Sequence, residues 1–351
     1  MAEPTLITLP IGDLPDAIRH GMRSNIITVI LGPPGCGKTQ IALQVAKEDQ
    51  VQYSEMLLAG RDIGDVMMPY VDPDDGLTFH YNPRLPIVGN PNFNTERPIL
   101  LNVDEMSGAS RLMQNVMLKA FDERLIGEAK LLPNVRLMAT GNRSWDMAHV
   151  EQLSAALGNR ASFITVEPDL DAFLTYGTKN NFHPLVLAWV KFDPQYLFRF
   201  DPDQFLAGDH AFCSPRSNER LSNILHERDQ YGMKDSIFRA FACGTIGAAI
   251  GIKFVGFCEM EKELPDIPAL LRGEKQHHPD SPSVIYATVY SIVQRVAESN
   301  LKHALDYVSG FKREWGQMFV SSFVQAQPDL IATPEWGEFV ASNANFVANR
   351  V

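Results

Sequence analysis

One octapeptide, Gly32-Pro33-Pro34-Gly35-Cys36-Gly37-Lys38-Thr39, has the residue types and spacing that bind the phosphates of a nucleotide. It fits the pattern G-x-x-x-x-G-K-[ST]. Glycines let successive backbone N–H groups face one anion, and the start of a following helix adds its positive dipole end. Lys38 is expected to reach the β- and γ-phosphates, and Thr39 offers a hydroxyl to Mg²⁺. The octapeptide therefore predicts a site for ATP and Mg²⁺, although no residue pattern here excludes GTP.

Two adjacent carboxylates, Asp104 and Glu105, follow the apolar run Ile99–Val103. Hydrolysis of a triphosphate needs one carboxylate beside the metal and a second group that polarises the attacking water. We assign Asp104 to the metal and Glu105 to the water. The alternative is an acidic pair that only caps the next helix, because acidic side chains favour helix starts.

These residues need strands and helices that hold them in place. Short β-branched or apolar runs predict buried strands at Ile26–Leu31, Ile99–Val103, Val135–Thr140 and Phe163–Val166. Helical spacing predicts helices at Lys38–Ala46 and Arg111–Asp122. Strands that alternate with helices indicate an α/β fold with a parallel sheet. The phosphate-binding octapeptide then lies between a strand and a helix, where such a loop belongs.

The second half of the chain shows helical spacing and no strong strand pattern. We predict an α/β nucleotide-binding core at 1–180, a helical lid at 181–265 and a helical C-terminal extension at 266–351. The polar, proline-containing segment 259–283 marks the last boundary. Trp315, Phe319 and Phe323, at four-residue spacing, predict a packed helical core.

Composition limits the partners and the compartment. The 351 residues carry a formal charge of −11, which argues against nucleic acid as the principal ligand. No apolar run approaches the roughly 20 residues that span a bilayer, and the first residues lack a signal-peptide layout. The four cysteines form no CxxC pair. We expect a cytoplasmic protein without membrane insertion.

Further residues resemble the AAA+ superfamily of ATPases, and within it the MoxR-like branch. The likeness covers roughly residues 20–230. It rests on the following segments: Asp104-Glu105-Met106-Ser107, Gln114-Asn115, Glu123-Arg124, Gly127 and Leu137-Met138-Ala139-Thr140-Gly141-Asn142-Arg143. The resemblance places Asn142 at the sensor 1 position, where its amide would orient the attacking water or touch the γ-phosphate. An asparagine that merely ends a strand is the alternative.

The same resemblance suggests roles for arginines. Arg160, in Leu157-Gly158-Asn159-Arg160, stands where the family places its arginine finger, which acts on the nucleotide of a neighbouring subunit. Arg143 is a competitor, because Ala161 stands where the family usually has phenylalanine. Arg216, in Ser214-Pro215-Arg216-Ser217, resembles sensor 2, and Ser-Pro is also an ordinary helix start.

The long stretch between the phosphate-binding octapeptide and Asp104 is similar to the helix-2 insertion of MoxR-like and chelatase-like ATPases. Asp72–Gly76 predicts a turn and Leu77–Tyr81 a returning strand. In the family such a hairpin projects into the pore or toward a partner. An ordinary exposed hairpin is the alternative.

By resemblance, the protein would be a homo-oligomeric, hexameric ring that hydrolyses ATP to remodel a protein client, as chaperone-like MoxR ATPases do. A partner with a von Willebrand factor A domain would be expected. Three alternatives remain open: a nucleic-acid or restriction-type motor, the ATPase subunit of a metal chelatase, and an assembly module that binds ATP without hydrolysing it.

Overall fold

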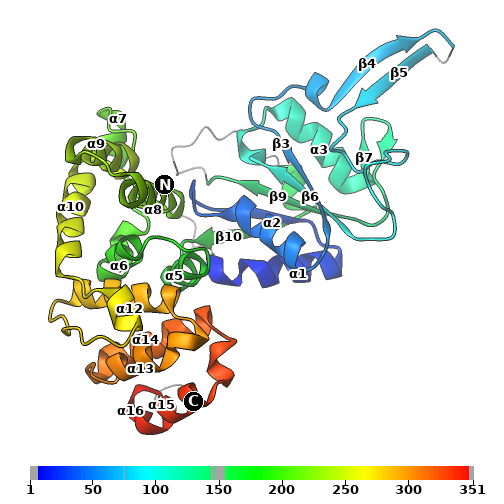
Figure 1. Cartoon of the computed structure of the whole chain (residues 1–351). Coiled ribbons are helices and arrows are strands. Elements are labelled where there is room, and N and C mark those ends of the chain that lie inside the picture. Colours follow the sequence, from blue (N-terminus) through cyan, green and yellow to red (C-terminus); the bar gives the residue numbers. More distant parts are fainter. Residues whose placement is uncertain (1–6, 75, 144–145, 147–154, 348–351) are drawn as a thin grey trace. The chain divides into compact units, whose positions relative to one another are not determined.

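The computed structural model describes residues 7–74, 76–143, 146 and 155–347. The chain forms two compact units, Met1–Asp169 and Leu170–Val351 (Figure 1). The predicted boundaries of the core at 180 and of the lid at 265 stay predictions.

The first unit contains a six-stranded sheet in which every pairing is parallel. Its strand order is β1-β10-β2-β9-β6-β3. The strands are β1 (Thr8–Pro10), β2 (Thr28–Leu31), β3 (Gln52–Leu57), β6 (Ile99–Asp104), β9 (Val135–Gly141) and β10 (Ser162–Glu167). The four predicted strands and the parallel α/β class are confirmed. The two edge strands, β1 and β3, were missed because β1 is only three residues long and β3 mixes polar with apolar residues.

Helices and two hairpins complete this unit. The helices are α1 (Leu14–Ser24), α2 (Lys38–Glu48), α3 (Arg111–Glu123) and α4 (Ala155–Gly158). The hydrophobic core includes the inner residues of β6 and β9 and the apolar face of α3. A small hairpin, β7 (Leu125–Ile126) with β8 (Ala129–Lys130), follows α3. A parallel sheet of this kind places the carboxyl ends of all its strands at one edge.

The predicted hairpin in the long insertion is present. Strands β4 (Met67–Asp72) and β5 (Gly76–Tyr81) pair antiparallel, and Gly76, the first residue of β5, has a positive φ of 74°, which glycine adopts readily. Tyr70 and His80 stack across the hairpin with ring centroids 3.9 Å apart. Figure 1 shows the hairpin extending away from the sheet of its own unit.

The described part of the second unit contains helices and no strand, as the sequence predicts. Its α-helices are α5 (Leu170–Lys179), α6 (Pro184–Phe192), α7 (Pro202–Leu206), α8 (Pro215–Tyr231), α9 (Asp235–Ile246), α10 (Ala248–Cys258), α11 (Ile267–Leu271), α12 (Pro282–Arg295), α13 (Leu301–Val308), α14 (Arg313–Ala326), α15 (Pro334–Ser342) and α16 (Ala344–Val347). Phe319 and Phe323 are fully buried in its core. Trp315, one turn earlier, is only half-buried. Over the described residues, no helix is both long enough and apolar enough to cross a bilayer.

Candidate nucleotide-binding site

The phosphate-binding loop connects β2, in the interior of the sheet, to α2. Gly35 and Gly37 have φ values of 75° and 109°, which side-chain-bearing residues rarely adopt. Gly32 is required for a different reason: a Cβ there would lie 2.7 Å from Val166 Cγ2 and 2.9 Å from the Val166 carbonyl oxygen. The glycines therefore let the loop turn tightly and pass close to β10.

Lys38 lies at the first position of α2 and is 9% exposed. Its ammonium donates to the carbonyl oxygens of Gly32, at 2.8 Å, and of Pro33, at 3.0 Å. Burial lowers the pKa of Lys38 from the ordinary lysine value. An incoming anion would offset this desolvation, so the lysine is suited to bind phosphate.

Asp104, the last residue of β6, is linked to both neighbouring elements. Thr39 Oγ1 donates to Asp104 Oδ1 at 3.0 Å. The Thr140 hydroxyl, from β9, donates to the same carboxylate oxygen. The two residues assigned to the metal, Thr39 and Asp104, thus lie together, and Thr140 fixes the orientation of the carboxylate.

Glu105 projects from a constrained backbone position. Its φ of 52° places it in the left-handed region, which is costly for a residue other than glycine. Its backbone N–H donates to Thr140 Oγ1 at 3.4 Å, and its side chain is exposed. Glu105 is thus an exposed carboxylate directly after the end of β6, where a reacting water could approach.

Asn142 directly follows β9 and contacts the phosphate-binding lysine. Lys38 Nζ donates to Asn142 Oδ1 at 3.3 Å. The Asn142 backbone N–H donates to Ser107 Oγ at 2.8 Å, which holds the loop after β9 against the turn after β6. The predicted site residues that end or follow β2, β6 and β9 are therefore brought together.

Thr140 and Ser107 support the site and were missed as separate contributors. Both lie inside the motif segments that carry the AAA+ resemblance. Their only signal is a small hydroxyl residue two positions from a motif carboxylate or asparagine. Because serine and threonine often end strands or begin turns, that signal does not separate a supporting hydroxyl from an ordinary one.

The two candidate finger arginines have different surroundings. Arg143 is 8% exposed and its guanidinium binds Asp146, with the shortest contact at 2.8 Å, and Glu167. Arg160 lies on the surface, where Nη2 contacts Asp122 Oδ2 at 2.9 Å and Nη1 donates to the Ala156 carbonyl. Arg143 is held inside its own chain by two carboxylates, whereas Arg160 has a contact that a neighbouring molecule could replace.

Arg216 lies in the first turn of α8, in the second unit, and its side chain is exposed. The helix begins with a capping box, in which Ser214 Oγ accepts from the Ser217 N–H at 3.1 Å. The helix start that the Ser-Pro sequence predicts is therefore present. The role of Arg216 toward a nucleotide stays a prediction.

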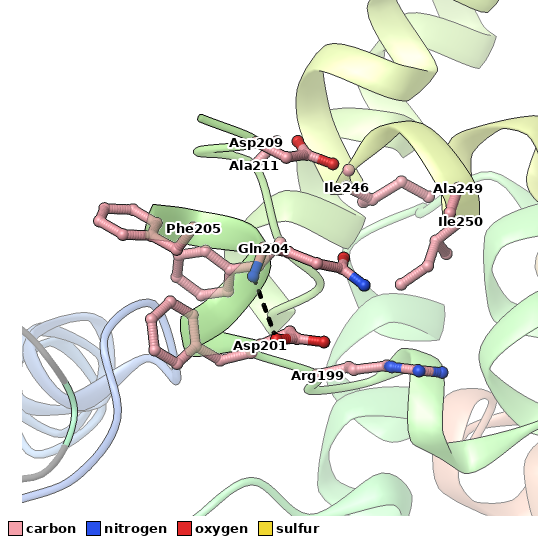
Figure 2. A pocket seen from close by; sticks show the side chains of 12 residues that line it. Arg199, Asp201, Gln204, Phe205, Asp209, Ala211, Ile246, Ala249 and Ile250 are labelled. Carbon is pink, nitrogen blue, oxygen red and sulfur yellow. Dashed lines mark hydrogen bonds between the residues drawn. The ribbon is translucent and has the colours of Figure 1, made fainter. Parts of the chain in front are cut away.

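The segment before α8 encloses a small cavity, seen in Figure 2. Asp201 accepts from the Gln204 N–H, and Asp209 accepts from the Ala248 N–H at 2.9 Å, at the start of α10. The cavity has a volume of about 20 Å³. That space holds about one water molecule, so these carboxylates cap helices and do not form a substrate site.

The donor set fits a magnesium nucleotide. The positive-φ glycines and Lys38 suit an oligophosphate, and the Thr39 hydroxyl and Asp104 carboxylate are oxygen ligands of the kind Mg²⁺ prefers. Within the described ranges, no group of three His, Cys, Asp or Glu side chains could hold a metal by itself. Mg²⁺ commonly uses one or two protein ligands together with phosphate oxygens.

Comparisons with known proteins show distant similarity only. No protein-family model matches the sequence. No curated protein matches it either. Among solved structures, RuvB of Thermotoga maritima, a Holliday junction branch migration motor, is 16% identical over 74% of this chain and 72% of that chain, with a TM-score of 0.35. NtrX from Brucella abortus, in complex with ADP, is 15% identical over 97% of this chain and 66% of that chain, with a TM-score of 0.40. The fold is therefore assigned from the strand order and loop geometry of this chain.

Proposed function

We propose that this protein is an ATP hydrolase of the AAA+ class, in its MoxR-like branch, which works as a homo-oligomeric ring on a protein client. The observation that carries the proposal is the meeting of three strand ends. Lys38 contacts Asn142 at 3.3 Å, and Thr39 contacts Asp104 at 3.0 Å. These two contacts join the phosphate loop to both candidate catalytic strands.

Each residue has a separate task at this site. The loop N–H groups and Lys38 bind the phosphates, and Mg²⁺, when bound at Thr39 and Asp104, supplies charge neutralisation of the phosphate oxygens. Glu105 accepts a proton from the attacking water, or orients that water, because its carboxylate is exposed beside the metal-side residue. Asn142 orients the same water or the terminal phosphate through its side-chain amide.

The surface position of Arg160 is the basis for proposing a ring. A surface guanidinium within the first unit can be offered to the nucleotide of a neighbouring copy, where it would neutralise charge in the transition state. Hydrolysis then depends on assembly, and assembly provides the coupling to a protein client. A partner with a von Willebrand factor A domain, a hexameric ring and a cytoplasmic location belong to the same proposal and rest on the MoxR resemblance.

The proposal is tested by measuring ATP hydrolysis against protein concentration, with particle mass by light scattering. We expect the specific activity to rise as subunits associate. Glu105→Gln should retain ATP, assemble and stall, whereas the matched Glu128→Gln, at an exposed glutamate outside the site, should hydrolyse normally. A protein that stays monomeric, with a specific activity independent of its concentration, would contradict the proposed ring.

The alternatives give different results in the same assay. Strong stimulation by DNA, lost at high salt, would favour a nucleic-acid motor. Stimulation by a tetrapyrrole-binding subunit would favour a chelatase. Tight ATP binding by the unaltered protein without any turnover would identify an assembly module.

A further inference from the structure

A second cavity lies wholly within the helical unit, between α5, α6, α12 and α14. Its volume of about 360 Å³ is in the range of small-molecule sites. Trp315, Tyr286 and Tyr290 supply aromatic walls, and the rings of Tyr286 and Trp315 meet edge to face with centroids 5.3 Å apart. Trp315 therefore lines a cavity, whereas Phe319 and Phe323 of the same helix fill the core.

The cavity has an acidic rim. Asp171, in the first turn of α5, and Glu314, in the first turn of α14, both line it and are exposed. Burial, and then the charge of Glu314, raise the pKa of Tyr286. Burial raises the pKa of Tyr290 as well, with a smaller contribution from Asp171. The negative potential of the two carboxylates thus reaches the aromatic walls.

We propose that this cavity binds an alkylammonium group, either a lysine side chain of another protein or a free amine. Aromatic faces attract cations through the ring quadrupole, and the attraction is larger where water is partly excluded. Carboxylates at the rim pair with the ammonium, while Leu174 and Met318 contact its methylene groups. The site does not depend on the proposed ATP hydrolysis, because every residue that forms it lies in the second unit.

Lys191 is the cation already present at this cavity. It lies in the last turn of α6, where the helix dipole favours positive charge. Among the residues that the structure describes, Lys191 forms no ion pair with either rim carboxylate. Its charge should therefore repel an incoming ammonium, which gives an unusual expectation: removing Lys191 should tighten binding.

The test is an NMR titration of the full-length protein with butylammonium and with 1-butanol, its neutral counterpart of the same chain length. We expect butylammonium to bind more tightly by roughly tenfold. Glu314→Gln should weaken butylammonium binding by roughly fivefold, and Lys191→Met should strengthen it by roughly threefold. Glu335→Gln is the matched control, since Glu335 is an exposed glutamate in the first turn of α15, outside the cavity. It should change nothing.

A lysine-containing peptide and putrescine distinguish the two sources of the ammonium group. Tighter binding of the peptide indicates a protein ligand, and tighter binding of putrescine a free amine. The proposal is overturned if butylammonium binds no better than 1-butanol, or if Glu314→Gln and Glu335→Gln behave alike. Trp315→Leu, whose fold is checked by thermal unfolding, should weaken the binding of butylammonium more than the binding of 1-butanol. Equal losses would mean that the tryptophan contributes only packing.

Discussion

The phosphate-binding residues and the three candidate arginines are positioned in contrasting ways. Lys38 begins the helix that follows β2, and Asp104 and Asn142 lie at the ends of the parallel strands β6 and β9. Lys38 contacts Asn142, and Asp104 accepts from Thr39 and Thr140. Arg143 is buried in ion pairs, whereas Arg160 and Arg216 have surface-accessible side chains. A parallel sheet can complete a phosphate site within one chain, but a group that acts on another chain has to remain at the surface. This contrast can be tested one residue at a time.

The largest effect is expected for Lys38→Ala. Removing the ammonium takes away the cation that donates to Asn142 and to the loop carbonyls, so nucleotide binding and hydrolysis should both be lost. Calorimetric titration with ATP and Mg²⁺ measures the first, and phosphate release the second. Lys47→Met, at an exposed lysine of the same helix, serves as the control. Normal binding by Lys38→Ala would contradict the site.

Arg160→Ala should leave nucleotide binding intact and lower hydrolysis by about 10³-fold, because a trans-acting arginine contributes only in the transition state. Mixed with wild-type chains, it should inhibit more than in proportion to its fraction. Its thermal stability should not change measurably, since the ion pair with Asp122 is at the surface. A variant that hydrolyses at the wild-type rate would exclude Arg160 as the finger.

The sequence predicts the motif residues of the site better than the residues that hydrogen-bond to them. The phosphate loop, Asp104 and Glu105 follow from motif spacing, because a backbone nest and a strand-end carboxylate need particular residues at particular positions. The roles of Thr140 and Ser107 do not follow from motif spacing, because many side chains at a strand end could accept or donate one hydrogen bond. Asp146 was missed because an acidic residue three positions after Arg143 belongs to no motif that marks it as the partner of that arginine. The predicted division of the helical half stays untested.

The cavity of the second unit shows why its chemistry could not be predicted. Asp171, Tyr286 and Glu314 come from three helices separated by many residues. Helical periodicity assigns each of them to one face of its own helix, but it contains no information on which helices pack together. Trp315 illustrates this limit. Its four-residue spacing with Phe319 predicts that both side chains lie on the same core face, but Trp315 lines the cavity.

Arg143→Met should lower the free energy of unfolding. It should affect ATP hydrolysis mainly through that loss of stability. It would leave Asp146, only 8% exposed, as a buried carboxylate without its main partner, at a cost of about 3 kcal/mol in the free energy of unfolding. Urea denaturation measures this cost. The double variant Arg143→Met/Asp146→Asn should recover part of the loss, because the unpaired charge is gone. If Arg143→Met kept full stability but abolished hydrolysis, Arg143 would replace Arg160 as the catalytic arginine.

The smallest effect concerns the pH dependence of stability without nucleotide. Burial makes the pKa of Lys38 lower in the folded chain than in the unfolded chain. Between these two pKa values the unfolded chain binds more protons, so the free energy of unfolding should rise with pH through that window, by at most about 1.4 kcal/mol per pH unit. The contribution of Lys38 is the difference between the wild-type protein and Lys38→Met, measured by urea denaturation across alkaline pH. Lys47→Met should keep the wild-type slope, because Lys47 is exposed. Equal slopes for Lys38→Met and wild type would mean that the ammonium is solvated, and then the phosphate loop would hold no desolvated charge for an anion to offset.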